Sequence, residues 1–105
     1  MALKPTQRFK QRYVAFVLTC NALHPAYAEA KELVHSHFLS FFGESGISSL
    51  AFKLVKYDDK AGIGIVRCER SRVDEIIFCM ACLSSWKGQA ARMEPRSTSG
   101  TIRRL

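Results

Sequence analysis

Long apolar stretches are missing from this sequence of 105 residues. It has no run of about 18 apolar residues, the length that a membrane-spanning helix requires. Basic residues, and not an apolar signal core, follow Met1. Internal repeats and low-complexity segments are also absent. We therefore expect a cytoplasmic protein without a membrane partner, and the length fits one compact domain.

The patterns of a self-contained active site are missing as well. There is no G-x-S-x-G elbow, no P-loop and no Cys–His pairing at readable spacing. His35 and His37 are two residues apart on an expected helix, so they point to different sides and cannot hold one ion. We expect one to be exposed and the other to lie at the edge of the core. Asp58 and Asp59 fit a tight turn, and a contact to hydrated Mg²⁺ is the alternative. We predict no catalytic residue and no metal site.

Four cysteines are present, but their surroundings do not fit a zinc site. Cys79 and Cys82 lie in IIFCMACL, an apolar run at helical period, whereas zinc pairs of this spacing usually sit on a glycine-rich turn. Cys20 and Cys68 stand alone in strand-like segments. We interpret all four as small buried thiols.

Acidic residues are few, and the excess of positive charge lies at the two ends of the chain. Residues 1–12 hold four cations and no acid, residues 87–105 hold five cations and one acid, and residues 13–86 carry one net negative charge. Basic ends on a neutral body suit a polyanion such as nucleic acid, because phosphates attract Lys and Arg. Basic tails that merely aid solubility are the alternative.

The hydrophobic pattern predicts an α+β fold with the order β-α-β-β-α-β. Pro25 and Gly43 bracket the first helix, and Ser71 with Asp74 resembles a capping box at the start of the second, which would end near Gly88. Pro95 is expected to end the last strand. The predicted strands cover residues 12–20, 50–57, 61–68 and 89–93, the helices cover 25–42 and 71–88, and 43–49 and 58–60 are loops.

This order is typical of the RRM-like or ferredoxin-like sandwich, in which two helices cover one face of a four-stranded antiparallel sheet. We therefore divide the chain into a basic N-terminal arm (1–11), a folded domain (12–95) and a basic C-terminal tail (96–105). No second folded domain is expected.

Alternation along the strands predicts which residues line the uncovered face of the sheet. The third strand, AGIGIVRC, has the glycine and valine spacing of an RNA-reading strand but none of its aromatic residues. Gly62, Gly64, Val66 and Cys68 are expected to face the helices. The open face would then be largely aliphatic, with Tyr13, Tyr57 and Arg67 as its stacking groups, and such a face usually binds a partner. We expect its protein-binding residues to include Tyr13, Val17, Ile63 and Ile65.

Three segments in order give the sequence a family resemblance: LKPTQRFKQRYVAF, YDDKAGIGIVRCER and SGTIRRL. It resembles the Rpp14/Pop5 family, the RRM-like protein subunits of archaeal and eukaryotic ribonuclease P. The matching positions are Arg12-Tyr13, the third strand from Gly62 to Cys68, and Ser99 to Arg103. Many members continue beyond the last segment into a further helix, whereas this sequence ends at Leu105, so we expect a partner to cover the open sheet face.

The resemblance implies a subunit of a ribonucleoprotein whose RNA cleaves precursor tRNA, using Mg²⁺, to give the mature 5′ end. It also implies as partners the ribonuclease P RNA, a TIM-barrel-like subunit called protein component 3, the other protein subunits and the precursor tRNA. The chain itself would hold no cofactor. We expect its phosphate contacts to come from Lys4, Arg8, Lys10, Arg12, Arg67, Arg103 and Arg104.

Two hypotheses from other classes also fit parts of the sequence. A stand-alone binder of single-stranded RNA would also suit this fold, with Tyr13 as the base-stacking residue. Acylphosphatases share the order of elements, but they use a glycine-rich loop with an arginine after the first strand, where this chain has CNALHP. A hydrolase is therefore the third hypothesis.

Overall fold

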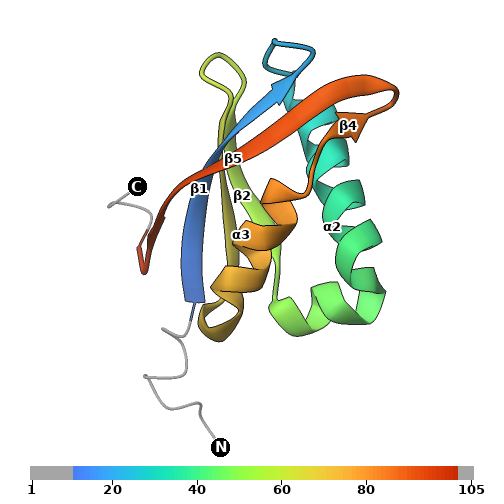
Figure 1. Cartoon of the computed structure of the whole chain (residues 1–105). Coiled ribbons are helices and arrows are strands. Elements are labelled where there is room, and N and C mark those ends of the chain that lie inside the picture. Colours follow the sequence, from blue (N-terminus) through green and yellow to red (C-terminus); the bar gives the residue numbers. More distant parts are fainter. Residues whose placement is uncertain (1–10, 102–105) are drawn as a thin grey trace, which may run out of the picture.

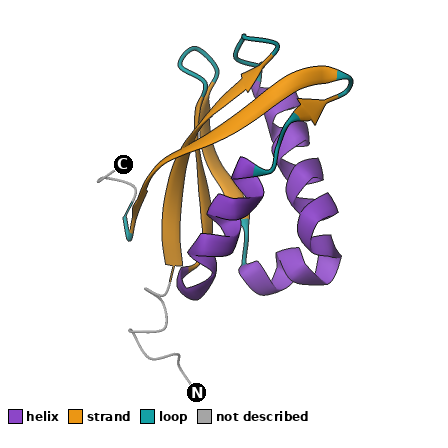
Figure 2. Ribbon diagram, viewed as in Figure 1, coloured by secondary structure: helices purple, strands orange, loops and turns teal. Residues whose placement is uncertain are grey.

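The computed structural model describes residues 11–101, which form an antiparallel sheet with two helices packed on one face (Figures 1 and 2). Along the sheet the strands follow the order β2-β3-β1-β5-β4. A short 3₁₀ turn, Arg70–Arg72, precedes the second helix. The elements are β1 (Gln11–Cys20), α2 (Tyr27–Leu50), β2 (Lys53–Asp58), β3 (Ile63–Glu69), α3 (Val73–Ala81), β4 (Ser85–Trp86) and β5 (Gln89–Ser99).

The core lies between the sheet and the helices, and strand alternation builds it as predicted. On β1, Val14, Phe16 and Leu18 are fully buried, because every second residue of the strand faces the helices. Val66 and Cys68 join them from β3. The helices supply the other half of the core, with Leu33, Val34 and Phe38 from α2 and Ile76, Cys79 and Met80 from α3.

Gly64 allows the centre of this sheet to pack closely. A Cβ atom at this position would lie 2.4 Å from Cζ of Phe16, the residue opposite it on β1. The aromatic ring therefore occupies the space that a side chain on β3 would need. The glycine spacing of AGIGIVRC is thus explained by packing inside the domain.

The prediction of four strands was one strand short, and the predicted end of the last strand was wrong. Ser85–Trp86 forms a short extra strand that pairs with Gln89–Ala90 at the start of β5. β5 itself continues through Pro95 to Ser99, so part of the expected tail pairs with β1. The Ala91 N–H donates a hydrogen bond to the Ser84 carbonyl oxygen, on the edge of β5 that faces away from β1. Because every second residue of a strand directs its N–H to the same edge, the nitrogen of Pro95 also lies there. β4 pairs with Gln89 and Ala90 and does not reach Pro95, so no described strand needs a hydrogen-bond donor at that position.

Both helices differ from their predicted bounds. Gly43 does break the first helix, with φ 77° and ψ 171°, but the expected loop after it forms further helical turns to Leu50. Leu50 is fully buried and Ile47 is half-buried, so apolar contacts hold these turns in place. The second helix ends at Ala81, and no side chain caps its start. Ser71 instead donates a hydrogen bond to Glu69, so the capping box was wrong.

The predicted faces of β2 were wrong beyond Leu54 because the strand contains a bulge. Leu54 is paired with Val66 and Lys56 with Ile65, which leaves Val55 as an extra residue. The shift places Lys56 on the open face and turns Tyr57 towards the helices. There the Tyr57 hydroxyl donates to the Pro25 carbonyl oxygen at 2.7 Å, so Tyr57 is not a stacking group of the open face.

The cysteines and histidines mostly follow their predicted environments. Cys20, Cys68 and Cys79 are buried, but Cys82 is exposed, because it lies just beyond the last turn of α3. His35 is exposed, and His37 lies at the core edge, where its Nε2 is 2.7 Å from the carbonyl oxygen of Cys79. Neither helix in residues 11–101 has the length and apolar character needed to cross a bilayer.

Candidate protein and nucleic-acid interfaces

The face of the sheet opposite the helices has a small apolar centre. Ala15 and Ile65 are neighbours across β1 and β3, and both are more than nine-tenths buried although they lie outside the core cluster. Tyr13 and Val17 flank them and are half-buried, while Ile63 is 44% exposed. All four residues predicted for protein binding, Tyr13, Val17, Ile63 and Ile65, therefore share one surface, which we call the open sheet face.

Basic side chains border this apolar centre. Lys53, Arg67 and Tyr13 are paired in one row across β2, β3 and β1. In the next row Lys56 lies beside Ile65, and near the other end of β1 Arg92 on β5 is paired with Thr19. The bulge in β2 brings Lys56 to this face, and sequence alternation alone missed it. Two cations and an aromatic ring thus lie side by side near the start of β1.

Arg67 has an unmet hydrogen-bonding requirement. Its Nε is buried, and no group in residues 11–101 accepts a hydrogen bond from it. A buried donor without an acceptor costs about 1–3 kcal/mol, so such atoms are rare in folded proteins. An acceptor from a bound molecule would remove this cost. Of all the predicted site residues, Arg67 therefore carries the clearest sign of a missing partner.

The two ends of the folded region lie together. Tyr13 near the start of β1 is paired with Ser99 at the end of β5, and Figure 1 shows both strand ends at the same end of the sheet. Arg12 lies there, beside a shallow pocket of about 280 Å³ lined by Arg12, Ser99, Gly100 and Thr101. The other basic residues predicted at the ends, Lys4, Arg8, Lys10, Arg103 and Arg104, lie outside the described residues.

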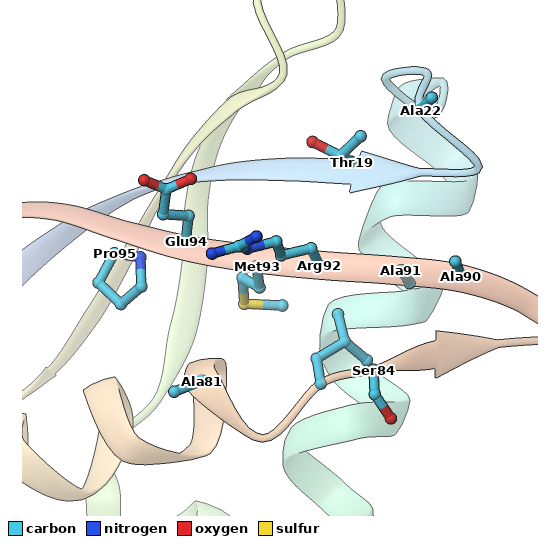
Figure 3. Close-up of a pocket in the computed structure, with 11 residues that line it drawn as sticks. Thr19, Ala22, Ala81, Ser84, Ala90, Ala91, Arg92, Met93, Glu94 and Pro95 are labelled. Carbon is cyan, nitrogen blue, oxygen red and sulfur yellow. The ribbon is translucent and has the colours of Figure 1, made fainter.

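A larger groove of about 570 Å³ runs beside β5 and the end of α3, and sequence reasoning did not anticipate it. Met93 points from β5 towards α3, and Glu94 points away from it (Figure 3). Small alkyl side chains, including Ala81, Ala90 and Ala91, make up much of the lining. Arg92 and Glu94 are its charged members, and no histidine or cysteine lines it. This groove offers shape and apolar contact, without a pair of groups suited to acid–base chemistry.

The titratable groups have structural roles. Burial raises the pKa of the Cys68 thiol to about 11 and that of Cys79 to about 12, which keeps both protonated and unreactive at neutral pH. Asp58 accepts a hydrogen bond from the Lys60 N–H at 3.0 Å, as expected for the turn. Within residues 11–101, no three His, Cys, Asp or Glu side chains gather closely enough to hold a metal ion.

Comparison with known proteins identifies close relatives over most of the chain. A model of the Rpp14/Pop5 family matches residues 12–105. Ribonuclease P protein component 2 of Pyrococcus furiosus is 36% identical over 104 residues, which cover 98% of this chain and 85% of the relative. The protein of that name from Pyrococcus horikoshii is 35% identical over 103 residues, with the same two shares. The one from Methanocaldococcus jannaschii is 33% identical, over 97% of this chain and 74% of the relative.

A solved structure shares the fold. A chain in the cryo-EM structure of yeast ribonuclease MRP superposes with a TM-score of 0.69 at 13% identity, over 91% of this chain and 78% of that chain. This likeness supports the arrangement of a curled antiparallel sheet with two helices. The match to the family model and the identities above 30% over nearly the whole chain lead to one conclusion: the chain belongs to the Rpp14/Pop5 family.

Proposed function

We propose that this chain is a protein subunit of the ribonuclease P ribonucleoprotein. In that complex it supports the RNA-catalysed, Mg²⁺-dependent cleavage of precursor tRNA that gives mature 5′ ends. The observation that carries the proposal is the likeness, over nearly the whole chain, to relatives named ribonuclease P protein component 2. The proposed setting is the cytoplasm.

The subunit binds two kinds of partner with different surfaces. The open sheet face contacts another protein subunit, the TIM-barrel-like protein component 3, because its apolar centre of Val17, Ile63 and Ile65 suits a protein surface. The basic ends of the chain contact the phosphates of the ribonuclease P RNA. Arg67 lies beside Tyr13 on the open sheet face, and its Nε, which has no partner within residues 11–101, takes an acceptor from one of the bound partners.

Catalysis belongs to the RNA in this proposal. Mg²⁺ is the cofactor of the RNA, and the protein contributes positive charge and a docking surface. Asp58 is engaged in its own turn, with the Lys60 N–H as hydrogen-bond donor. The protein thus lowers the Mg²⁺ concentration that the RNA needs for cleavage, because Lys and Arg side chains neutralise part of the phosphate charge.

The alternative of a stand-alone single-stranded RNA reader has less support. Readers of that kind stack bases on aromatic residues of the central strands, and each stacked base contributes about 1–3 kcal/mol. The central strands β1 and β3 present Tyr13 as the single aromatic residue on the open sheet face. Tyr57, which was expected to be a second stacking group of that face, instead faces the helices.

Reconstitution tests the proposed function. The full chain and the TIM-barrel-like subunit are added to ribonuclease P RNA, and cleavage of precursor tRNA is measured over a range of Mg²⁺ concentrations. We expect the two proteins to lower the Mg²⁺ concentration at half-maximal cleavage, and the partner alone to have a smaller effect. The control omits the RNA, and the protein pair alone should not cleave. Cleavage that is unchanged by this chain at every Mg²⁺ concentration would refute the proposal.

A further inference from the structure

The pocket at the joined ends of β1 and β5 has the properties of an anion site. Among residues 11–101, its lining consists of Arg12, Ser99, Gly100 and Thr101, so a residue with a guanidinium and two residues with hydroxyl groups meet in one place. None of these side chains is acidic. Arg12 enters the pocket from the start of β1, and the other three residues enter from the end of β5 and the bend that follows it.

Arg12 is available to a ligand. In residues 11–101 its hydrogen bond is to the adjacent Gln11 carbonyl oxygen, at a long 3.4 Å, and no described carboxylate lies within 4.0 Å of it. A guanidinium has five N–H donors in a planar fork that matches the oxygen atoms of a phosphate. Most of that donor capacity is therefore unused within the described part of the chain.

Gly100 makes room for the guanidinium. A Cβ atom at residue 100 would lie 2.8 Å from the Nη1 atom of Arg12, closer than real Cβ contacts. The guanidinium group therefore lies against the backbone of Gly100, and any larger residue would displace it. This contact places the positive charge of Arg12 beside the bend that follows β5.

Ser99 shapes the other side of the pocket. Its Oγ accepts a hydrogen bond from the N–H of Thr101 at 3.1 Å, which holds the bend around Gly100. A hydroxyl that accepts in this way keeps its own O–H as a donor. Thr101 also lines the pocket. Residues of both strand ends therefore border one small space.

We propose that Arg12, Ser99 and Thr101, with Gly100 as the spacer, bind one phosphate group of an RNA backbone. The inference rests on the proposed function and deepens it by naming a specific phosphate contact. RNA is favoured over a carboxylate of a protein partner because of what the sequence holds on either side. In the sequence, Lys4, Arg8 and Lys10 precede Arg12, and Arg103 and Arg104 follow Thr101, so the pocket residues are flanked by basic sequence on both sides.

Binding of the full chain to ribonuclease P RNA at several salt concentrations tests this site. Arg12→Ala should weaken binding about tenfold and reduce the slope of log affinity against log salt by about one. Gly100→Ala keeps the charge but shifts the guanidinium, so we expect a measurable loss that is smaller than that of Arg12→Ala. The control is Arg96→Ala, which removes an exposed cation of β5 that lies outside the pocket, 4.0 Å from Glu94, and should have a smaller effect than Arg12→Ala.

Two results would overturn the proposal. One is wild-type affinity in Gly100→Ala together with equal losses in Arg12→Ala and Arg96→Ala, because Arg12 would then be a general positive charge. The other is that Arg12→Ala weakens binding to the protein partner and leaves RNA binding unchanged, which would assign the pocket to a carboxylate. Thermal unfolding of each variant should stay close to that of the wild type, since Gly100 is exposed.

A second measurement separates the pocket from the function of the complex. Inorganic phosphate is titrated into the isotope-labelled full chain, and the amide signals of Gly100 and Thr101 are followed by NMR. We expect saturable shifts in the wild type that are lost in Arg12→Ala. If wild-type protein does not bind the RNA but shows these shifts, the proposed function fails and the phosphate site stands. If the shifts are absent, the site itself is refuted.

Discussion

At the residue scale, Tyr57 ties two elements together through one hydroxyl group. The hydroxyl donates to the carbonyl oxygen of Pro25 at 2.7 Å and so fastens β2 to the segment that leads into α2. Burial, with smaller contributions from the charges of Asp59 and Asp58, raises the Tyr57 pKa from 10.0 to about 12. Removing the proton would break the hydrogen bond and leave a half-buried negative charge beside two carboxylates.

Tyr57→Phe should therefore change stability in a way that depends on pH. Near pH 7 we expect a loss of about 1 kcal/mol, because one hydrogen bond is removed. Between pH 10 and 12 the unfolded tyrosine loses its proton while the folded one keeps it, so the wild type loses stability as the pH rises. Phenylalanine has no such loss, and the gap between the two proteins should narrow across this window.

Urea unfolding at pH 7, 10 and 11.5 measures that gap. The control is Tyr27→Phe, because Tyr27 is 52% exposed and its hydroxyl has no hydrogen-bond partner in the described part of the chain. It should differ little from the wild type at pH 7. A gap between the wild type and Tyr57→Phe that stays constant from pH 7 to 11.5 would contradict the raised pKa.

At the element scale, Gly43 determines the path of the chain between the long part of α2 and its last turns. Its φ of 77° and ψ of 171° lie in a region that is open to glycine and nearly closed to other residues. Figure 1 shows α2 changing direction near the bottom of the molecule, before the chain enters β2. This change of direction lets Ile47 and Leu50 reach the core from the far side of the break.

Gly43→Ala should destabilise the domain by about 1–3 kcal/mol, through the backbone alone. No atom lies within 4 Å of a Cβ placed there, so a steric clash would not contribute. Urea unfolding at pH 7 measures the change, and Ser45→Ala, an exposed residue two positions on, is the matched control. Stability equal to the wild type would mean that the break in α2 adjusts at no cost.

Some strands could be predicted from the sequence and others could not. The residues of β1 and β3 alternate strictly between the core and the open sheet face, so the alternation of their residues in the sequence was enough to predict both strands and their faces. β2 contains an extra residue at Val55, and local sequence does not mark a bulge that depends on pairing with β3. Pro95 was expected to end β5, because proline has no N–H for a neighbouring strand. It is tolerated because β4 is too short to pair with this part of β5, and the length of β4 is known only from the assembled sheet.

The candidate site was predictable to the same extent. Alternation placed Tyr13, Val17, Ile63 and Ile65 on one surface, and the structure brings them together. The phosphate pocket could not be predicted from the sequence, because it brings together Arg12 and Gly100, which are 88 positions apart in the chain. Such a contact follows from the register of β1 and β5, and that register extends beyond the proline that was expected to end it.

At the scale of the whole molecule, two exposed apolar surfaces lie on opposite sides. The open sheet face presents Ile63, which is 44% exposed. The helix side presents Phe78, which is 64% exposed and contacts Phe41 of α2 edge-on with ring centroids 6.0 Å apart. Asp74 lies one helical turn before Phe78 on α3, and Glu75 is paired with Arg72. Either surface could in principle hold a protein.

The proposed function assigns the TIM-barrel-like partner to the open sheet face, and a matched pair of variants tests that choice. Ile63→Ser and Phe78→Ser each replace an exposed apolar side chain with the same small polar one, so neither should unfold the domain. Calorimetric titration with the partner should show about tenfold weaker binding for Ile63→Ser, as for a central apolar contact of an interface, and little change for Phe78→Ser. The reverse pattern would move the protein interface to the helices, and the aliphatic sheet face would then need a different occupant.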